Sequence, residues 1–165
     1  MNKDISKVDI RPVEIEELDQ VLDLFIANCP EVETDIGELN YAFDDSSERI
    51  QVAVSQDNGI VGVAWYTEWD VDGIGAHVVV VDQAFRGKGI GRRLLQELDP
   101  ATNGRKYTCF SLRDTEFAAI HFLRHNGYVV AKAFEFADEH MYLLRKDAFK
   151  SAPISLAKRL KWEVM

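Results

Sequence analysis

The sequence has few cysteines, no long hydrophobic run and no apolar leader, and each absence excludes a class of protein. Its two cysteines, Cys29 and Cys109, lie far apart and outside any CxxC pair. This argues against a disulfide scaffold or a zinc ribbon and favours a reducing compartment. No apolar run approaches the roughly 18 residues that a membrane span needs. The opening residues, MNKDISKVDIRP, are charged and unlike a signal peptide. We therefore expect a cytoplasmic protein that has no membrane partner.

Positive charge is scarce over most of the chain and concentrated in one place. The formal net charge is −9, which argues against nucleic-acid binding because such binding needs a basic surface. Residues 12–48 contain twelve acids and no Lys or Arg, whereas residues 83–96 contain four basic residues and no acid. A compact basic island in an acidic protein favours an anionic ligand there. The alternative is a solvated face whose charges only aid solubility.

The length and composition fit a single globular domain. The chain has 165 residues, 47% of them hydrophobic, which is enough for a substantial core. It contains no internal repeat and no linker rich in Pro, Gly or Ser. We expect one domain over residues 1–165, with residues 151–165 forming a C-terminal helical extension.

Hydrophobic periodicity predicts an α+β domain with a mixed sheet. The order is a meander of strands, then alternating strands and helices, then a closing hairpin. A capping box at Asp114 or Thr115 is expected to start the last of the core helices. The predicted strands span residues 8–12, 49–55, 60–67, 74–81, 106–112, 128–136 and 140–145, and the predicted helices span residues 14–28, 35–43, 90–98 and 115–126.

The segment FRGKGIGRR, residues 85–93, joins a valine-rich strand to a helix and has the features of a phosphate-binding loop. Its alternating glycines let the backbone turn sharply and approach a ligand closely. Free amides and the dipole at a helix N-terminus favour phosphate. The first helical turn normally prefers acids, yet here it carries Arg92 and Arg93, which are unfavourable unless an anion joins them.

The glycine pattern distinguishes between classes of phosphate site. The loop lacks the GxxxxGK[ST] of a Walker A motif and the third glycine of the dinucleotide fingerprint. The remaining pattern, Arg86-x-x-Gly89-x-Gly91, resembles the pyrophosphate loop of the GNAT superfamily of acyl-CoA-dependent N-acetyltransferases. Residues 119–128, AIHFLRHNGY, resemble that family's second motif, and the order of elements matches over nearly the whole chain.

The resemblance implies a mostly antiparallel sheet, flanked by helices and splayed open between the strand ending at Val81 and the strand beginning near Lys106. Acetyl-CoA would be the cosubstrate, with no metal, and its acetyl group would pass to a primary amine by direct attack in a ternary complex. A strand amide near Val79 would polarise the thioester carbonyl. The acceptor would be a small-molecule or peptide amine, and the protein a monomer or homodimer. The implied cofactor-binding residues are Val79, Val80, Val81, Arg86, Gly87, Lys88, Gly89, Ile90, Gly91 and Arg92.

Two positions depart from the family pattern and leave other functions open. Glu116 stands where the family often has an asparagine that touches pantetheine, and Leu123 stands where it often has a general-acid tyrosine. A non-catalytic acyl-CoA-binding or sensing module is therefore the alternative to an enzyme. A nucleotide-binding domain of another family is disfavoured by the glycine pattern.

An N-acetyltransferase needs a group that accepts the proton of the ammonium substrate. The candidate bases are Glu68 and Asp70, near the end of the second hairpin strand, and His77, which period two places on the same face as Val79 and Val81. Each has a purely structural interpretation as well, as a solvated acid or a hydrogen-bonded strand histidine. Residues 12–74 contain sixteen acids and one base. This charge favours a cationic acceptor.

Overall fold

The computed structural model describes residues 7–69 and 72–149, which form two compact units. The first unit comprises the chain up to Glu68 together with Ala76–Leu98. The second comprises Trp69–Gly75 and the chain from Asp99 onwards. The candidate base Asp70 and the helix expected over residues 151–165 lie outside the described residues. The expectation of one domain over residues 1–165 stays a prediction.

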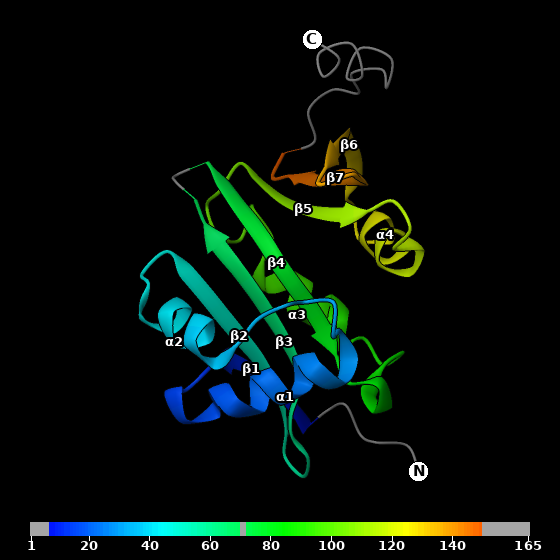
Figure 1. Cartoon of the computed structure of the whole chain (residues 1–165). Helices are drawn as coiled ribbons and strands as arrows, with labels where there is room; N and C mark the ends of the chain where they lie inside the picture. The colour runs from blue at the N-terminus through cyan, green and yellow to red at the C-terminus, as the bar shows by residue number, and fades with distance from the viewer. Residues whose placement is uncertain (1–6, 70–71, 150–165) are drawn as a thin grey trace. The chain divides into compact units, whose positions relative to one another are not determined.

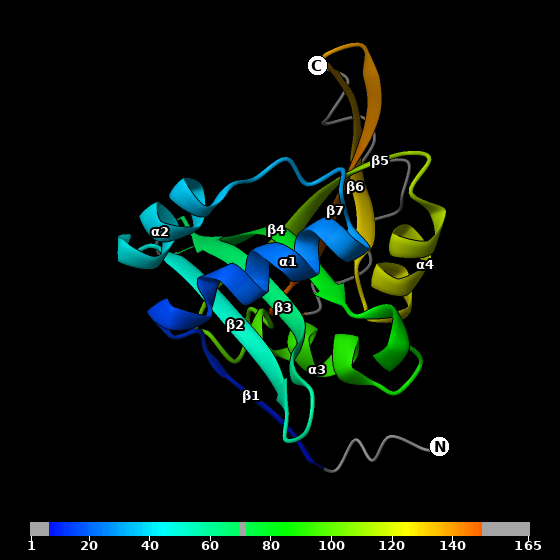
Figure 2. The same ribbon diagram turned by 60° about the horizontal axis from the view of Figure 1, so that its bottom comes forward.

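Four strands of the first unit follow one another in the sheet in the order of the sequence (Figure 1). β1 pairs with β2 and β2 with β3, both antiparallel, with Ile50 opposite Trp65. A register shift between Ala53 and Val54 accommodates the tight β2–β3 turn visible in Figure 2. The strands are β1 (Val8–Pro12), β2 (Glu48–Ser55), β3 (Gly59–Glu68) and β4 (Gly73–Val81), of which residues from Ala76 belong to this unit.

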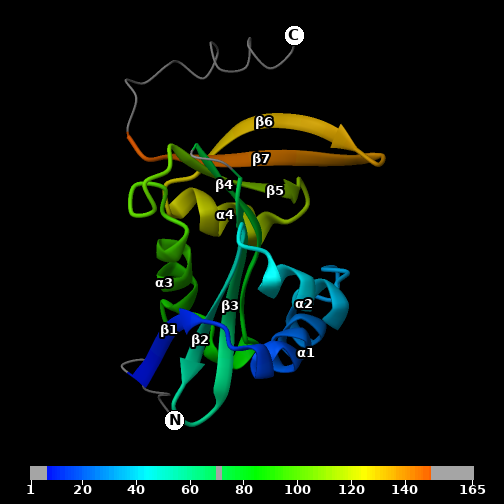
Figure 3. The same cartoon turned by 90° about the vertical axis from the view of Figure 1, so that its left-hand side faces the viewer.

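Helices cover both faces of this four-stranded region. Figure 3 shows α1 (Leu18–Asn28) and α2 (Ile36–Asp44) on one face and α3 (Ile90–Glu97) on the other. The α1–α2 face is closed by a cluster of buried residues that includes Val21, Phe25, Leu39, Val52, Val63 and Val80. The apolar spacing that predicted these helices and strands is the spacing that fills this core.

Helix α3 lies unusually close to the sheet because a glycine faces it. A Cβ atom at Gly62 would come within 2.9 Å of Leu94 Cδ1 and 3.2 Å of the Val80 carbonyl oxygen. Both Leu94 and Ile90 are almost fully buried. Helix α3 is therefore held against the sheet at β3, and the loop before it is held with it.

The second unit has three strands in the order β5-β7-β6, with antiparallel pairing and one helix. Phe110 of β5 pairs with Leu144 of β7, and the Phe110 ring meets the Tyr128 ring edge-on at 5.3 Å. Lys146 Nζ donates to Asp99 Oδ2 at 2.9 Å. Its elements are β5 (Tyr107–Arg113), α4 (Phe117–His125), β6 (Val129–Phe136) and β7 (Glu139–Asp147).

Over the described residues, the seven strands, mostly antiparallel, and the four α-helices confirm the expected α+β class with a mixed sheet. Among residues 7–69 and 72–149, no helix is long and apolar enough to cross a lipid bilayer. The capping box expected at Asp114 or Thr115 is wrong. Helix α4 is capped by Glu116, whose side chain instead accepts a hydrogen bond from the Arg113 amide at 2.7 Å.

The helix expected over residues 14–28 begins as a separate 3-10 turn, Ile15–Glu17, before α1. Glu14 and Glu17 form a reciprocal capping box around that turn. Arg11 of β1 binds the Glu17 carboxylate with both guanidinium nitrogens, at 2.6 and 2.9 Å. This bidentate pair fixes the chain between β1 and α1.

We expect Glu17→Gln to lower the free energy of unfolding by about 1 kcal/mol at neutral pH, because it breaks this pair. The hydrogen bond from Arg11 lowers the pKa of Glu17. A carboxylate with a lowered folded-state pKa contributes stability above its unfolded pKa and loses it as the pH falls through the folded pKa. The free energies of unfolding of wild type and variant, measured in urea, should therefore differ at pH 7 and become equal in acid. A difference that stays constant with pH would contradict this assignment.

Candidate active site

The loop before α3 is fixed at its start by two hydrogen bonds and one buried side chain. A 3-10 turn, η3 (Gln83–Phe85), follows β4 and is capped by Asp82, whose carboxylate accepts from the Ala84 amide at 2.8 Å. Asn28 at the end of α1 accepts from the Gln83 amide at 3.0 Å. The Phe85 side chain is buried and anchors the turn. The residues that follow are thus presented from a rigid base.

Two glycines of this loop adopt a left-handed backbone that other residues rarely take. Gly87 has φ +74° and Gly89, the N-cap of α3, has φ +85°. A Cβ atom at either position would meet nothing within 4 Å. Glycine is therefore needed here for its backbone conformation, and the space in front of the loop is open. The Arg93 amide donates to the Gly89 carbonyl at 3.1 Å. The amides of a first helical turn before such a bond have no partner within the helix, and such amides can bind an anion.

The basic residues of the loop divide into one with a structural contact to another element and others that stay beside the loop. Arg93 is structural, since its Nη1 donates to the Val8 carbonyl at 2.9 Å and joins α3 to β1. Arg86 is exposed and its Nε donates to the Val81 carbonyl at 2.9 Å, which holds the guanidinium beside the loop. Arg92 is exposed in the first turn of α3, and Lys88 Nζ lies 6.0 Å from the centre of the Phe85 ring. Three cations therefore surround the helix N-terminus.

The sequence-predicted cofactor residues thus form one continuous segment at the end of β4. Residues 86–92 make the loop and first helical turn, and Val79, Val80 and Val81 precede them in β4. The Val81 carbonyl already accepts from Arg86, and Val80 is buried in the core.

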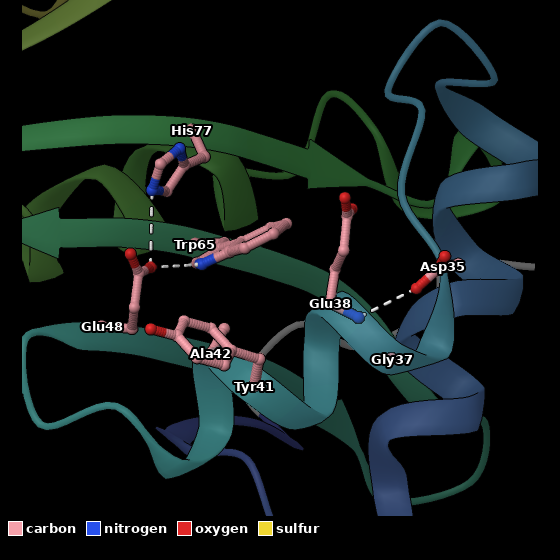
Figure 4. Close-up of a pocket in the computed structure, with 8 residues that line it drawn as sticks. All are labelled: Asp35, Gly37, Glu38, Tyr41, Ala42, Glu48, Trp65 and His77. Atoms are coloured by element: carbon pink, nitrogen blue, oxygen red, sulfur yellow. Dashed lines mark hydrogen bonds and ion pairs between the residues drawn. The ribbon is translucent and has the colours of Figure 1, made fainter.

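A cavity of about 540 Å³ opens between α2 and strands β2, β3 and β4 in the same unit (Figure 4). Three carboxylates, two aromatic rings and one imidazole line it, and none of its lining residues is a Lys or Arg. Such a lining favours a positively charged guest. The lining residues are Asp35, Gly37, Glu38, Tyr41, Ala42, Glu48, Trp65 and His77.

His77 is the one described candidate base that lies in this cavity. Its ring stands 4.9 Å from the ring of Trp65, which itself stacks on Phe25. Buried and more exposed residues alternate along this part of β4: Val78 and Val80 are buried, whereas His77, Val79 and Val81 are more exposed. This pattern agrees with the period-two placement of His77 with Val79 and Val81.

Glu68, another candidate base, is held at the end of β3 by contacts with residues 47 and 49. Its carboxylate lies 3.3 Å from Arg49 Nη2, and its amide donates to the Ser47 carbonyl at 2.8 Å. Glu68 is not among the residues that line the cavity.

Sequence reasoning missed Glu48, the first residue of β2. Its carboxylate is only 16% exposed and accepts hydrogen bonds at 2.7 Å from Trp65 Nε1 and from Thr67 Oγ1. His77 Nε2 lies 3.4 Å from Glu48 Oε2. The available signal was the strand period, because Glu48 precedes Ile50 and Val52 by two and four residues and shares their face.

Other groups singled out by their chemistry have ordinary surroundings. Burial raises the pKa of both the Cys29 and Cys109 thiols to about 11, so neither is a reactive thiolate at neutral pH. Within the described parts of the chain, His, Cys, Asp and Glu side chains nowhere gather in a group of three that could hold a metal ion. Leu123, at the position of the family's tyrosine, is 3% exposed in the second unit.

A family model described as an acetyltransferase (GNAT) domain matches residues 46–130, just over half of the chain. The matched region contains β2 to β4, the loop, α3, β5 and α4. The chain therefore belongs to the GNAT family of N-acetyltransferases.

Solved structures of that family share the fold. A ribosomal-protein alanine N-acetyltransferase from Escherichia coli superposes with a TM-score of 0.73 at 14% identity, covering 88% of this chain and 96% of its own. A type Ii aminoglycoside 6'-acetyltransferase gives a TM-score of 0.73 at 21% identity, covering 87% and 99%. A mutant spermidine N-acetyltransferase from Vibrio cholerae gives 0.69 at 15%, covering 87% and 95%. None of the curated proteins matches the sequence significantly.

Proposed function

We propose that this protein transfers the acetyl group of acetyl-CoA to a cationic primary amine, by direct attack in a ternary complex. One observation carries the proposal: a basic, glycine-shaped helix N-terminus and an acid-lined cavity lie in the same structural unit. The first suits the pyrophosphate of CoA and the second suits a protonated amine. Family membership supports the reaction class.

The loop residues would hold the cosubstrate through its phosphates. Backbone amides of residues 87–92 would donate to the pyrophosphate oxygens, and the helix dipole adds to their effect. Arg86, Lys88 and Arg92 would neutralise the charge, and Arg86 is already oriented by its bond to the Val81 carbonyl. Acetyl-CoA supplies the thioester, whose carbonyl carbon is the electrophile.

The amine must lose a proton before it can attack, and His77 is placed to accept it. His77 lines the cavity that suits the amine, whereas Glu68 is held by Arg49. As the new C–N bond forms, the C–S bond breaks and the sulfur leaves as a thiolate. Because an ordinary thiol has a pKa of about 8.5, that thiolate is a tolerable leaving group without a tyrosine at Leu123.

The charge of the cavity supports a cationic acceptor. Asp35, Glu38 and Glu48 contribute carboxylates, while Trp65 and Tyr41 contribute ring faces that can hold a cation. Two structures that share the fold are named for acceptors with several amino groups, spermidine and aminoglycosides. These names support an amine of that kind here.

A panel of amines, peptides and aminoglycosides, assayed with acetyl-CoA by release of free thiol, tests the proposal. We expect the best acceptors to be cationic, with a kcat/KM that falls by about tenfold or more from low to high ionic strength. An analogue of the best acceptor that lacks positive charge apart from the reacting amine serves as the control for general effects of salt on the rate. A best acceptor that is anionic, or a rate that ignores salt, would contradict the cationic assignment.

A non-catalytic acyl-CoA-binding module is the second candidate, favoured by the aliphatic Leu123 at the position of the family's tyrosine. Tight acetyl-CoA binding in calorimetry without thiol release for any amine would support this alternative. Thiol release that depends on the presence of any one amine would exclude the non-catalytic module.

A further inference from the structure

We infer that Glu48 is a positioning residue for His77, acting through Thr67, and that it makes Nδ1 the nitrogen of His77 that accepts the substrate proton. This inference rests on the proposed function for its catalytic consequence, but its structural part stands alone. Its evidence is a chain of hydrogen bonds across β2, β3 and β4 that runs from Glu48 through Thr67 to His77. Figure 4 shows the two ends of this chain, Glu48 and His77, beside Trp65.

The strand register brings the three residues together. Glu48 of β2 lies directly opposite Thr67 of β3, and cross-strand partners have their side chains in contact range. Thr67 Oγ1 lies 2.7 Å from Glu48 Oε1 and 2.5 Å from His77 Nε2. The hydroxyl is thus placed between the carboxylate and the imidazole.

Proton counting then fixes the tautomer. An ionised carboxylate only accepts hydrogen bonds, so Thr67 must donate its single proton to Glu48. The same hydroxyl oxygen can then only accept from His77, which requires the proton of the neutral imidazole to be on Nε2. Nδ1 keeps its lone pair and is the basic nitrogen. A carboxylate that sets the tautomer of a histidine in this way is a known catalytic device.

A second contact explains why the residue must be a carboxylate. Glu48 Oε2 accepts from Trp65 Nε1 at 2.7 Å while Oε1 accepts from Thr67. A glutamine would place an oxygen at only one of these two positions and an NH2 group at the other, so it cannot accept both hydrogen bonds in this geometry. Glu48 also places a negative charge 3.4 Å from His77 Nε2, which stabilises the imidazolium that forms when the proton arrives.

The groups around His77 set the electrostatics of this step. Glu48, Trp65 and Thr67 face it from β2 and β3, and Asp35, Glu38 and Tyr41 line the same cavity from α2. Asp35 is occupied as the cap of α2, accepting from the Glu38 amide at 2.9 Å, and Glu38 accepts from Thr34 Oγ1 at 2.7 Å. Glu48 is the carboxylate with a contact to the imidazole.

The test combines nitrogen NMR of the imidazoles with steady-state kinetics. The chain has four histidines, so comparison with His77→Gln assigns the His77 signals. We expect the neutral wild-type ring to carry its proton on Nε2, and Glu48→Gln and Thr67→Val to lose that preference. We also expect Glu48→Gln to lower kcat/KM for the amine by roughly 10–100-fold. The acetyl-CoA affinity should be unchanged.

Glu17→Gln is the matched control, because Glu17 is equally buried and also hydrogen-bonded, but lies outside the cavity. It should leave the NMR tautomer and the pH profile as in wild type. In a His77→Ala background, Glu48→Gln should have no further effect on rate. A wild-type ring protonated on Nδ1, or Glu48→Gln acting equally with and without His77, would overturn the inference. If wild type shows the expected tautomer but turns over no amine, the proposed function fails while the tautomer assignment stands.

Discussion

Gly89→Asp should weaken acetyl-CoA binding by more than about tenfold while the protein stays folded. Gly89 caps α3 with φ +85°, and a side chain there would enter open space. Asp tolerates the left-handed backbone better than most residues, and a negative charge at a helix N-terminus is locally favourable. The substitution therefore spares the helix and places a carboxylate where phosphate would bind.

Two controls separate charge from backbone effects in this experiment. Gly89→Asn has nearly the same shape without the charge and should retain far more affinity than Gly89→Asp. Gly104→Asp introduces the same side chain at another left-handed glycine, φ +64°, that also faces open space. It should bind acetyl-CoA as wild type does. Unchanged calorimetric affinity in a folded Gly89→Asp protein would remove the loop as the phosphate site.

His77→Ala should lower kcat/KM for the amine by roughly 10²–10⁴-fold, the usual contribution of a general base. His77 is half-exposed in the cavity, so its removal leaves the core intact. The KM for acetyl-CoA should change little, since the loop is untouched. The loss should shrink as the pH rises, because a larger fraction of the amine is then already deprotonated.

His140→Gln is the control for His77→Ala. His140 is another strand histidine near a glutamate, with Nδ1 3.5 Å from Glu135 Oε1, but it is 71% exposed and belongs to the second unit. It should retain wild-type kinetics. A His77→Ala enzyme with an unchanged pH–rate profile would exclude His77 as the base and leave Glu68 and Asp70 as the candidates.

The backbone shape of the loop at residues 86–92 could be predicted from sequence because it depends on neighbouring residues, whereas its role in binding phosphate stays a prediction. The glycines, the basic first turn and the helix N-terminus are consecutive residues, and the left-handed φ values of Gly87 and Gly89 are what such a pattern requires. Most elements were found for the same reason, because apolar periodicity is also local. The helix boundary near Glu17 was missed because a contact with Arg11 on the preceding strand decides it.

The network around His77 could not be predicted, because it depends on strand register. Glu48 and His77 are 29 positions apart in the sequence, and Thr67 joins them only when β2 and β3 pair as they do. Glu48 itself appears in the sequence as one of twelve acids in an acidic stretch.

The basic loop and the acid-lined cavity of the first unit carry opposite charges, and this affects whether a ligand can bind at the wrong site. If the proposed sites are right, a polyanion such as CoA would be repelled by the carboxylates of the α2 cavity, and a cationic amine would be repelled by Arg86, Lys88 and Arg92. Each ligand would thereby be kept out of the other's site, so we expect dead-end complexes to be rare even when one ligand is in large excess. Salt screens this repulsion, and inhibition by excess substrate should accordingly emerge first at high ionic strength.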